Sequence, residues 1–254
     1  MAFQPYLDQL HSVLTRIARE QSERIIAAGR LIADALEAGG VLHAFGTGHS
    51  HLIAHEAFYR AGGLSAVNPI LDDRLIFLKG ALESTRAERE TGLAAAILAR
   101  EDVRPIDAAV LISNSGRNAV PVEMALELRA RGVKIVAITN IAQSSETSSR
   151  HVSGKRLFEL ADLAIDTCVP RGDAAVQLPG LDTPMGPSST VAGAAIMNSI
   201  IIEAASALLE RGKQPPILPS ANLDTTSEQT LRDRLGSYAA RIRYLDLGDI
   251  GEPS

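Results

Sequence analysis

The chain has 254 residues, of which 46% are hydrophobic, 22% charged and 4% aromatic, and its net charge is −5. This length can bury a core without metal or disulfide support, and the single cysteine, Cys168, excludes an internal disulfide. The mild acidity, the lack of a Lys/Arg cluster and the few aromatic residues argue against a nucleic-acid-binding surface. No uncharged apolar run approaches the ~18 residues of a membrane span. We therefore predict a soluble, cytoplasmic protein that binds neither membrane nor nucleic acid.

The first 38 residues predict a long amphipathic helix. Between residues 6 and 38, apolar side chains recur at intervals of mostly three, four or seven, and Gly39 and Gly40 end the pattern. An apolar stripe of this length needs another helix or a partner subunit to cover it. We therefore predict a homo-oligomer, either a dimer or a tetramer.

After Gly40, short apolar runs alternate with helical stretches. Strands are predicted at residues 41–45, 75–78, 109–113, 135–139 and 163–167, and helices at 51–61, 86–99, 119–131, 156–160 and 191–210. Strands that lack polar alternation and are separated by helices indicate a parallel sheet covered on both faces. The predicted fold class is α/β: a three-layer sandwich with a five-stranded parallel sheet, preceded by the long N-terminal helix.

The segment after Lys213 has a different character. It opens with Pro215, Pro216 and Pro219 and continues into a helical stretch at about residues 227–244. We predict an ordered extension packed on the core or on a partner subunit. The predicted organisation is an N-terminal helical arm at residues 1–38, one domain at 39–212 and a C-terminal extension at 213–254.

In a doubly wound sheet, ligands bind in the loops that follow the carboxyl ends of the strands. The first such loop, residues 46–50, reads Gly-Thr-Gly-His-Ser and precedes a helix. Glycines let the backbone approach a ligand, and a helix start offers free N–H groups to a phosphate. His51 replaces the third glycine of a dinucleotide-binding motif, and the Gly-Lys-Ser/Thr ending of a P-loop is missing. The alternative is a tight strand-to-helix turn capped by Ser50.

Two further loops have a similar composition. Residues 113–118, Ser-Asn-Ser-Gly-Arg-Asn, follow a buried strand, and their hydroxyls, the helix-start N–H groups and Arg117 could surround one phosphate. A nucleophile elbow would need glycine where Ser113 stands, which disfavours an esterase triad. Residues 186–190, Gly-Pro-Ser-Ser-Thr, place three hydroxyls at a helix start where one cap would suffice. Asn118 is the expected cap of the helix after residues 113–118, and helix capping alone is the alternative for residues 186–190. We expect hydroxyls and helix-start N–H groups to hold the phosphate, with only scattered cations nearby.

The titratable residues leave several alternatives open. His51 and His55 lie four residues apart beside Glu56, a spacing that can bind zinc, but no third ligand completes the set, so we predict no metal. Glu56 could instead form a surface ion pair with Arg60. His151 is either an ordinary loop histidine or an acid–base residue.

A helical stretch rich in acids adds further candidates. Glu83, Glu88 and Glu90 are either a solvated helix face, or one of them is catalytic.

At the three loops the sequence resembles the sugar isomerase (SIS) domain family. The matching stretches read VLHAFGTGHSHLIAHEAFYRAGG, AAVLISNSGRNAVPVEMALELRARGVKIVAITN and MGPSSTVAGAAIMN. The resemblance covers about residues 40–210, and the whole chain is most similar to stand-alone SIS-domain proteins described as phosphosugar isomerases. It implies a five-stranded parallel α/β sandwich, phosphosugar binding and assembly as at least a dimer.

The resemblance also implies roles for single residues. In phosphoheptose isomerases the first helix carries a His and then a Glu, at positions that here hold Glu56 and Arg60, so their zinc and heptose chemistry are not implied. In N-acetylmuramic acid 6-phosphate etherases a second acidic motif is similar to the region of Glu88. The loops and the resemblance together give these expected phosphate-binding residues: Gly46, Thr47, Gly48, Ser50, Ser113, Asn114, Ser115, Asn118, Ser188, Ser189 and Thr190.

The expected function is that of a phosphosugar-binding enzyme, an aldose–ketose isomerase acting on a sugar or amino-sugar phosphate without metal or cofactor. We expect Glu56 or Glu88 to act as the base and His151 or His55 as its partner. The alternatives are a non-catalytic phosphosugar sensor that regulates a partner and an etherase-like lyase.

Overall fold

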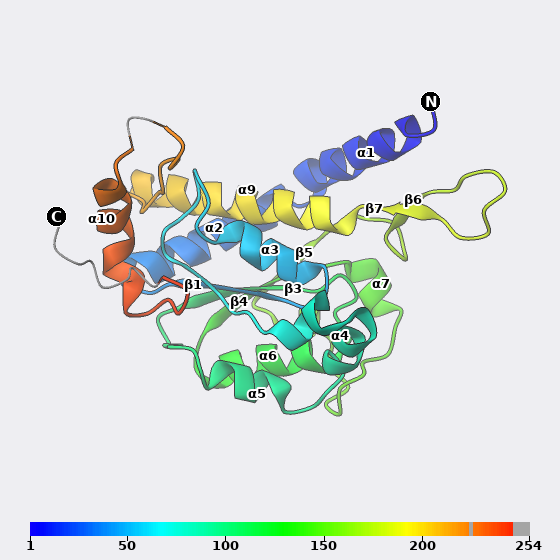
Figure 1. Cartoon of the computed structure of the whole chain (residues 1–254), viewed down its shortest axis with the longest axis horizontal. Helices are drawn as coiled ribbons and strands as arrows, with labels where there is room; N and C mark the ends of the chain where they lie inside the picture. Colours follow the sequence, from blue (N-terminus) through cyan, green and yellow to red (C-terminus); the bar gives the residue numbers. More distant parts are fainter. Residues whose placement is uncertain (224–225, 246–254) are drawn as a thin grey trace.

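The central feature of the computed structural model, which describes residues 1–223 and 226–245, is a parallel five-stranded sheet (Figure 1). Its strands are β1 (Leu42–Gly46), β2 (Val67–Pro69), β3 (Ala108–Ile112), β4 (Lys134–Thr139) and β5 (Leu163–Asp166). Their order across the sheet is β2-β1-β3-β4-β5, and every neighbouring pair is parallel. This is the strand order of doubly wound, flavodoxin-like folds. The predicted fold class is confirmed.

Both faces of the sheet are buried under helices, which explains why the strands read as continuous apolar runs. Along β3, Val110 and Ile112 belong to one apolar cluster, whereas Ala109 and Leu111 belong to the other. The period of two between opposite faces is that of an extended strand. Each half of the core therefore receives every second residue of the same strand.

The helices divide between the two faces of the sheet (Figure 1). One face carries α1 (Gln4–Glu20), α2 (Ser22–Glu37), α3 (Ser50–Ala57) and α9 (Ser189–Glu210). The other carries α5 (Leu93–Leu98), α6 (Ala119–Ala130) and α8 (Leu157–Leu160). The shorter helices α4 (Ala81–Ala87) and α7 (Ile141–Ser145) lie at the carboxyl end of the sheet.

The strand predicted at residues 75–78 is wrong. The second strand of the sheet is Val67–Pro69, which pairs with β1, and residues 73–79 form two single turns of 3-10 helix. The Asp72 side chain accepts a hydrogen bond from the Arg74 N–H at 3.0 Å and so starts the first turn. A short apolar run beside a polar residue is compatible with a strand or with a 3-10 turn. Here the Asp72 cap favours the turn.

Two predicted helices are interrupted. The N-terminal helix breaks at Gln21 into α1 and α2, and the predicted helix at 86–99 is replaced by α4 and α5. The second break occurs at Gly92, which has a φ of +81° and precedes α5. A left-handed residue cannot continue an α-helix, so the chain must restart there.

Further elements complete the structure. An antiparallel hairpin, β6 (Ala174–Val176) and β7 (Met185–Pro187), precedes α9 and was not predicted. The predicted C-terminal helix corresponds to α10 (Glu228–Ala239). Leu218, Leu235 and Ile242 of the C-terminal segment are buried against Val41, so the described part of this extension packs on its own core. The end of the chain, residues 246–254, lies outside the described residues.

One described helix, α9, is long and apolar enough to cross a membrane by length and composition alone. Half of its most apolar window is buried inside the protein, and it packs against α2 and α3. This is the pattern of a core helix.

Candidate active site

The crevice at the carboxyl ends of β1 and β3 is the natural ligand site of this topology. The connection after β1 enters α3 on one face of the sheet, whereas the connection after β3 enters α6 on the other. The two neighbouring loops therefore diverge at this point and leave a crevice between them. Both loops are among those that the sequence singled out.

The first loop brings a threonine hydroxyl to a distant carboxylate. Thr47 is buried, and its Oγ1 donates to Oε2 of Glu88 at 3.0 Å. Gly48 has a φ of +57° and its N–H donates to the carbonyl of Leu75 at 2.8 Å, which joins the loop to the segment leading into α4. The N-cap of α3 is His49, without a side-chain capping bond, and Ser50 is the first helical residue. The predicted Ser50 cap is therefore wrong.

Glu88 is the central residue of the crevice. It follows α4 directly, and the N–H of Val120 in α6 donates to its carbonyl at 3.1 Å. Its second carboxylate oxygen, Oε1, accepts from Nδ2 of Asn118. Burial raises the pKa of Glu88, and the Thr47 hydrogen bond opposes that rise only in part. A carboxyl with a raised pKa, held from both sides, is a suitable proton acceptor.

The second loop supplies a support for this carboxylate instead of a helix cap. Asn118 is the N-cap of α6, but its side chain makes no capping bond. Its Nδ2 donates to Glu88, and its Oδ1 accepts from Nη1 of Arg150 at 2.8 Å. Thr47, Glu88, Asn118 and Arg150 thus form one continuous hydrogen-bonded chain across the crevice.

Other polar groups of the second loop maintain its shape. The Ser113 hydroxyl accepts from the N–H of Gly116 at 3.2 Å, and Oδ1 of Asn114 accepts from the Thr167 hydroxyl at 3.1 Å. Gly116 has a φ of +59°, and a Cβ there would lie 2.9 Å from the buried Ser144 hydroxyl. Ser115 is half-exposed and, in the described part of the chain, its hydroxyl has no hydrogen-bond partner.

Guanidinium groups lie near Glu88: Arg89 and Arg150 act on its carboxylate, and Arg117 neighbours Arg150. Of these three, the sequence predicted Arg117 alone. Partial burial lowers the pKa of Arg150, and the neighbouring Arg89 and Arg117 lower it further. Arg89 and Arg150 in turn oppose the rise in the pKa of Glu88. Among the described residues, no carboxylate oxygen lies within 4.0 Å of any of these guanidiniums. The crevice therefore has uncompensated positive charge although the chain is acidic.

Arg89 and Arg150 could have been found from their sequence neighbours, Glu88 and His151, which were already candidates. Arg117 also carries a buried Nε without a partner, and its Nη2 donates to Ser148 at 3.3 Å.

The third loop lies at the same end of the molecule, where α9 begins (Figure 1), but an internal carboxylate engages it. Asp173 accepts from the N–H of Ser188 at 2.9 Å, from the N–H of Ser189 at 2.6 Å and from the Ser189 hydroxyl at 2.7 Å. No described hydrogen bond joins this loop to Glu88, and the phosphate-binding role of Ser188, Ser189 and Thr190 stays a prediction.

The other predicted catalytic residues lie apart from the Glu88 cluster. Glu56 of α3 pairs with Arg60, just beyond the end of that helix, at 3.4 Å, which is the ion pair predicted as the alternative. His55 is exposed on the same helix. His151 Nδ1 lies 2.8 Å from the Ser153 hydroxyl, and its Nε2 lies 3.6 Å from Glu123 on α6. No described contact joins these side chains to Glu88.

The side chains whose spacing suggested a zinc site, His51, His55 and Glu56, do not form a metal-binding group. Within residues 1–223 and 226–245, no group of three His, Cys, Asp or Glu side chains is placed to hold a metal ion. His51 is buried, and burial lowers its pKa to about 4, so its ring is neutral.

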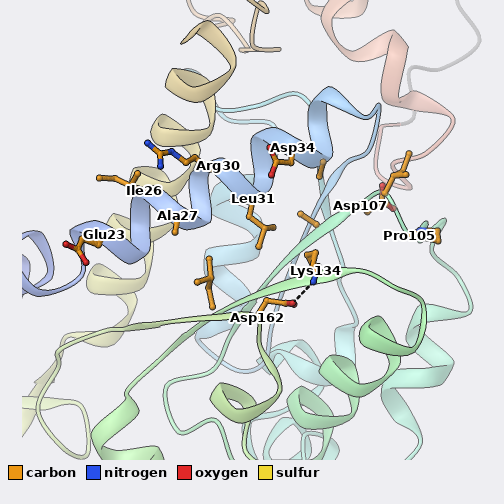
Figure 2. A pocket seen from close by; sticks show the side chains of 14 residues that line it. Glu23, Ile26, Ala27, Arg30, Leu31, Asp34, Pro105, Asp107, Lys134 and Asp162 are labelled. Atoms are coloured by element: carbon orange, nitrogen blue, oxygen red, sulfur yellow. Dashed lines mark hydrogen bonds and ion pairs between the residues drawn. The ribbon is translucent and has the colours of Figure 1, made fainter. Parts of the chain in front are cut away.

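A separate hollow of about 820 Å³ lies at the opposite, amino-terminal edge of the sheet (Figure 2). Leu31 of α2 faces it from one side, and the Lys134–Asp162 ion pair lies on the other. It shares no residue with the crevice.

Comparison with known proteins shows the family of this chain. The sequence profile of the SIS domain matches residues 5–140. The chain belongs to the SIS domain family. It is 38% identical over 240 residues to the UPF0309 protein GK1441 of Geobacillus kaustophilus, covering 94% of this chain and 95% of that one. It is 41% identical over 241 residues to the UPF0309 protein SCO4393 of Streptomyces coelicolor, covering 94% and 96%.

Solved structures show the same SIS fold at lower sequence identity. Phosphoheptose isomerase GmhA from Neisseria gonorrhoeae superposes with a TM-score of 0.56 at 16% identity, covering 79% of this chain and 95% of that one. A phosphoheptose isomerase from Francisella tularensis gives 0.51 at 16% identity, with the same coverage. At this identity the likeness concerns the fold alone.

Proposed function

We infer that the crevice binds a sugar phosphate and that the protein interconverts its aldose and ketose forms, with Glu88 as the base. The observation that carries this proposal is the hydrogen-bonded chain Thr47–Glu88–Asn118–Arg150, which holds one half-buried carboxylate beside uncompensated guanidiniums. Membership of the SIS family and the phosphoheptose isomerase fold support the same substrate class.

The charges of the crevice suit a phosphate. Arg89, Arg117 and Arg150 together exceed the Glu88 carboxylate by two charges, which matches a phosphate dianion. Guanidiniums donate two parallel hydrogen bonds to phosphate oxygens. The adjacent Ser115 hydroxyl and the helix-start N–H groups of α6 can complete the binding site, as the sequence analysis expected. Positive charge focused in a crevice also attracts an anion to a protein of negative net charge.

The proposed chemistry uses Glu88 as a proton carrier between two adjacent carbons. The ionised carboxylate takes the proton from the carbon next to the carbonyl, and the C–H electron pair forms a carbon–carbon double bond. The carbonyl π electrons move to oxygen, which is protonated, so that an enediol results. Glu88 then returns its proton to the former carbonyl carbon while the other hydroxyl loses a proton and becomes the new carbonyl. The raised pKa of Glu88 makes its carboxylate a stronger base than an exposed glutamate.

The test is a thermal-shift screen against aldose, ketose and amino-sugar phosphates, followed by NMR detection of conversion for each compound that binds. Glu88→Gln should keep the thermal shift and lose conversion. Glu83→Gln, an exposed carboxylate on α4, is the matched control and should convert normally. Binding by the wild-type protein without conversion of any compound would favour the sensor, and release of lactate from a muramic acid 6-phosphate would favour the lyase. If no sugar phosphate raises the melting temperature, the binding proposal is wrong.

The homo-oligomeric state, the cytoplasmic location and the division into arm, domain and extension stay predictions. The exposed Phe3, Leu7 and Leu14 of α1, which extends beyond the body of the molecule in Figure 1, support an oligomer.

A further inference from the structure

His49 is a titratable side chain at the rim of the crevice to which the sequence analysis gave no role. It follows Thr47 by two residues and is exposed. Its ring lies against that of Phe77, with 4.6 Å between the centroids. Phe77 belongs to the segment that leads into α4 and so to Glu88. The His49 ring therefore links the two segments whose side chains meet in the Thr47–Glu88 hydrogen bond.

Two of the other five histidines are buried in structural roles. His43 is fully buried, with its Nε2 3.0 Å from the Asp107 carboxylate and its Nδ1 3.0 Å from the Asn68 amide. His51 accepts the N–H of Asp72 at 3.4 Å through Nε2, and burial lowers the pKa of its ring to about 4. Neither of these buried rings is exposed to a ligand in the crevice.

Two of the remaining three lie on helices, and the third, His151, follows the crevice residue Arg150 but has only 10% of its side chain exposed. His11 is on α1, and His55 is on the exposed side of α3 beside the His51 ring. His151 is held by Ser153 on one side and faces Glu123 on the other. Of the six histidines, His49 alone is exposed and belongs to a loop that contacts Glu88 through a near neighbour.

We propose that His49 is the second proton-transfer residue of this site, acting on the substrate oxygens while Glu88 acts on the carbons. This rests on the proposed isomerase function. An isomerase needs such a residue because moving a proton between the two carbons also changes both oxygens. The old carbonyl oxygen must gain a proton, and the oxygen that becomes the new carbonyl must lose one. Imidazole is the side chain best suited to do both near neutral pH.

The steps balance. As Glu88 takes the carbon-bound proton, the imidazolium of His49 gives a proton to the carbonyl oxygen, which yields the neutral enediol. When Glu88 returns its proton to the other carbon, the neutral imidazole takes the proton of the second hydroxyl, and that oxygen becomes the carbonyl. Both residues end in their initial protonation states, and no oxidant or co-reactant is required.

The test compares His49→Gln with His11→Gln, an exposed histidine remote from the crevice, in the full-length protein. With any sugar phosphate that the wild type converts, His49→Gln should lower kcat by about 100-fold or more and leave KM within a factor of three. The limb of the pH–rate profile that reports the acid should disappear, and imidazole added to His49→Ala should restore part of kcat. A merely structural role for His49 would give none of these three results. His11→Gln should behave as the wild type.

A second measurement applies if the wild type converts nothing in the panel. The ring signals of His49 are then followed by NMR while inorganic phosphate is added, with His11 as the internal reference. A rise in the pKa of the His49 ring on phosphate binding supports its place at the ligand, and an unchanged pKa overturns it. Equal kcat values for His49→Gln and the wild type would refute the role of His49 but leave the proposed function standing. If neither phosphate nor any sugar phosphate binds, the proposed function is refuted as well.

Discussion

The hydroxyl of Thr47 donates to the carboxylate of Glu88 at 3.0 Å, although 41 residues separate the two in the chain. The contact joins the end of β1 to the residue that ends α4, across the crevice between the two faces of the sheet. Burial raises the pKa of the carboxylate while Thr47 and Asn118 hold it in place. The protein thus holds a half-buried acid of raised pKa in a fixed position, which is typical of active sites.

The first prediction concerns the stability cost of Glu88. Because its pKa is raised in the folded state, the native protein binds this proton more tightly than the unfolded chain does. Its contribution to stability is therefore most favourable at low pH and is lost as pH rises through the folded pKa. Glu88→Gln removes this pH-dependent loss of stability, because glutamine does not ionise. The Thr47 hydroxyl can rotate to accept a hydrogen bond from the new amide. The melting temperature of Glu88→Gln relative to wild type should rise between pH 4 and pH 8, and a difference that falls with pH would contradict the assignment.

The second prediction concerns the guanidinium cluster. Arg150→Gln should weaken the binding of inorganic phosphate and of sugar phosphates about 10- to 100-fold, since a hydrogen bond to a charged group contributes about 1.5–3 kcal/mol. Isothermal titration measures the loss directly. Arg30→Gln removes an arginine of α2, which lines the hollow at the opposite edge of the sheet, and should bind as the wild type does. Equal losses in both variants would indicate a general effect of net charge.

The third prediction separates two effects at Gly116. Its φ of +59° disfavours any side chain by about 1–2 kcal/mol, and a Cβ would also meet the Ser144 and Thr139 hydroxyls at 2.9 Å and 3.0 Å. Gly154 has a φ of +69° with nothing within 4 Å of the added Cβ. Urea unfolding should therefore show a loss of about 1–2 kcal/mol for Gly154→Ala and a clearly larger one for Gly116→Ala. Similar losses would show that Ser144 moves freely.

The fourth prediction concerns how the C-terminal extension is attached. Nη2 of Arg241 contacts Oδ2 of the fully buried Asp107 at 2.8 Å, and Oδ2 also lies 3.0 Å from Nε2 of His43. Removing one partner of a buried pair costs about 3–5 kcal/mol. We expect Arg241→Gln to lower the free energy of unfolding by about that amount and to accelerate amide exchange in α10. If amide exchange accelerates only in the core and stays unchanged in α10, this attachment is contradicted.

The same pair gives a pH dependence. Hydrogen bonds from His43, Arg241 and backbone N–H groups hold the pKa of Asp107 well below its ordinary value and outweigh the opposing effect of burial. Its stabilising contribution is therefore complete above the ordinary carboxyl pKa and is lost as pH falls below it. Asp107→Asn should be less stable than wild type at pH 7, with a difference that shrinks as the solution is acidified.

The fifth prediction concerns the oligomer. Leu7 and Leu14 lie on the same side of α1 and are 48% and 37% exposed. Exposed apolar side chains that share one helix face indicate that a partner covers them. Light scattering should give the mass of a dimer or a tetramer for the wild type. Leu7→Glu together with Leu14→Glu should lower that mass, whereas Thr15→Glu, on another side of the same helix, should not. A monomeric wild type would contradict the prediction.

Much of the fold could be predicted from local pattern. Four of the five predicted strands overlap real strands of the sheet, because a buried parallel strand is a short apolar run bounded by loops. The exception at residues 75–78 is equally apolar, but the Asp72 side chain starts a 3-10 turn just before it. The edge strand Val67–Pro69 was missed because three residues ending in proline give too short a pattern.

The α/β class and the two loops of the crevice could be predicted from the chain alone, since apolar periodicity and glycine-rich strand ends are local properties. Which side chains meet in the crevice follows from the packing of distant segments. The selection of Glu88 over Glu56, and the convergence of Arg89, Arg117 and Arg150 around it, depend on α4 and the loop after α7 crossing the carboxyl edge of the sheet. These contacts join residues 30 to 41 positions apart. The burial and the charge of the site arise from such contacts, and local composition does not reveal them.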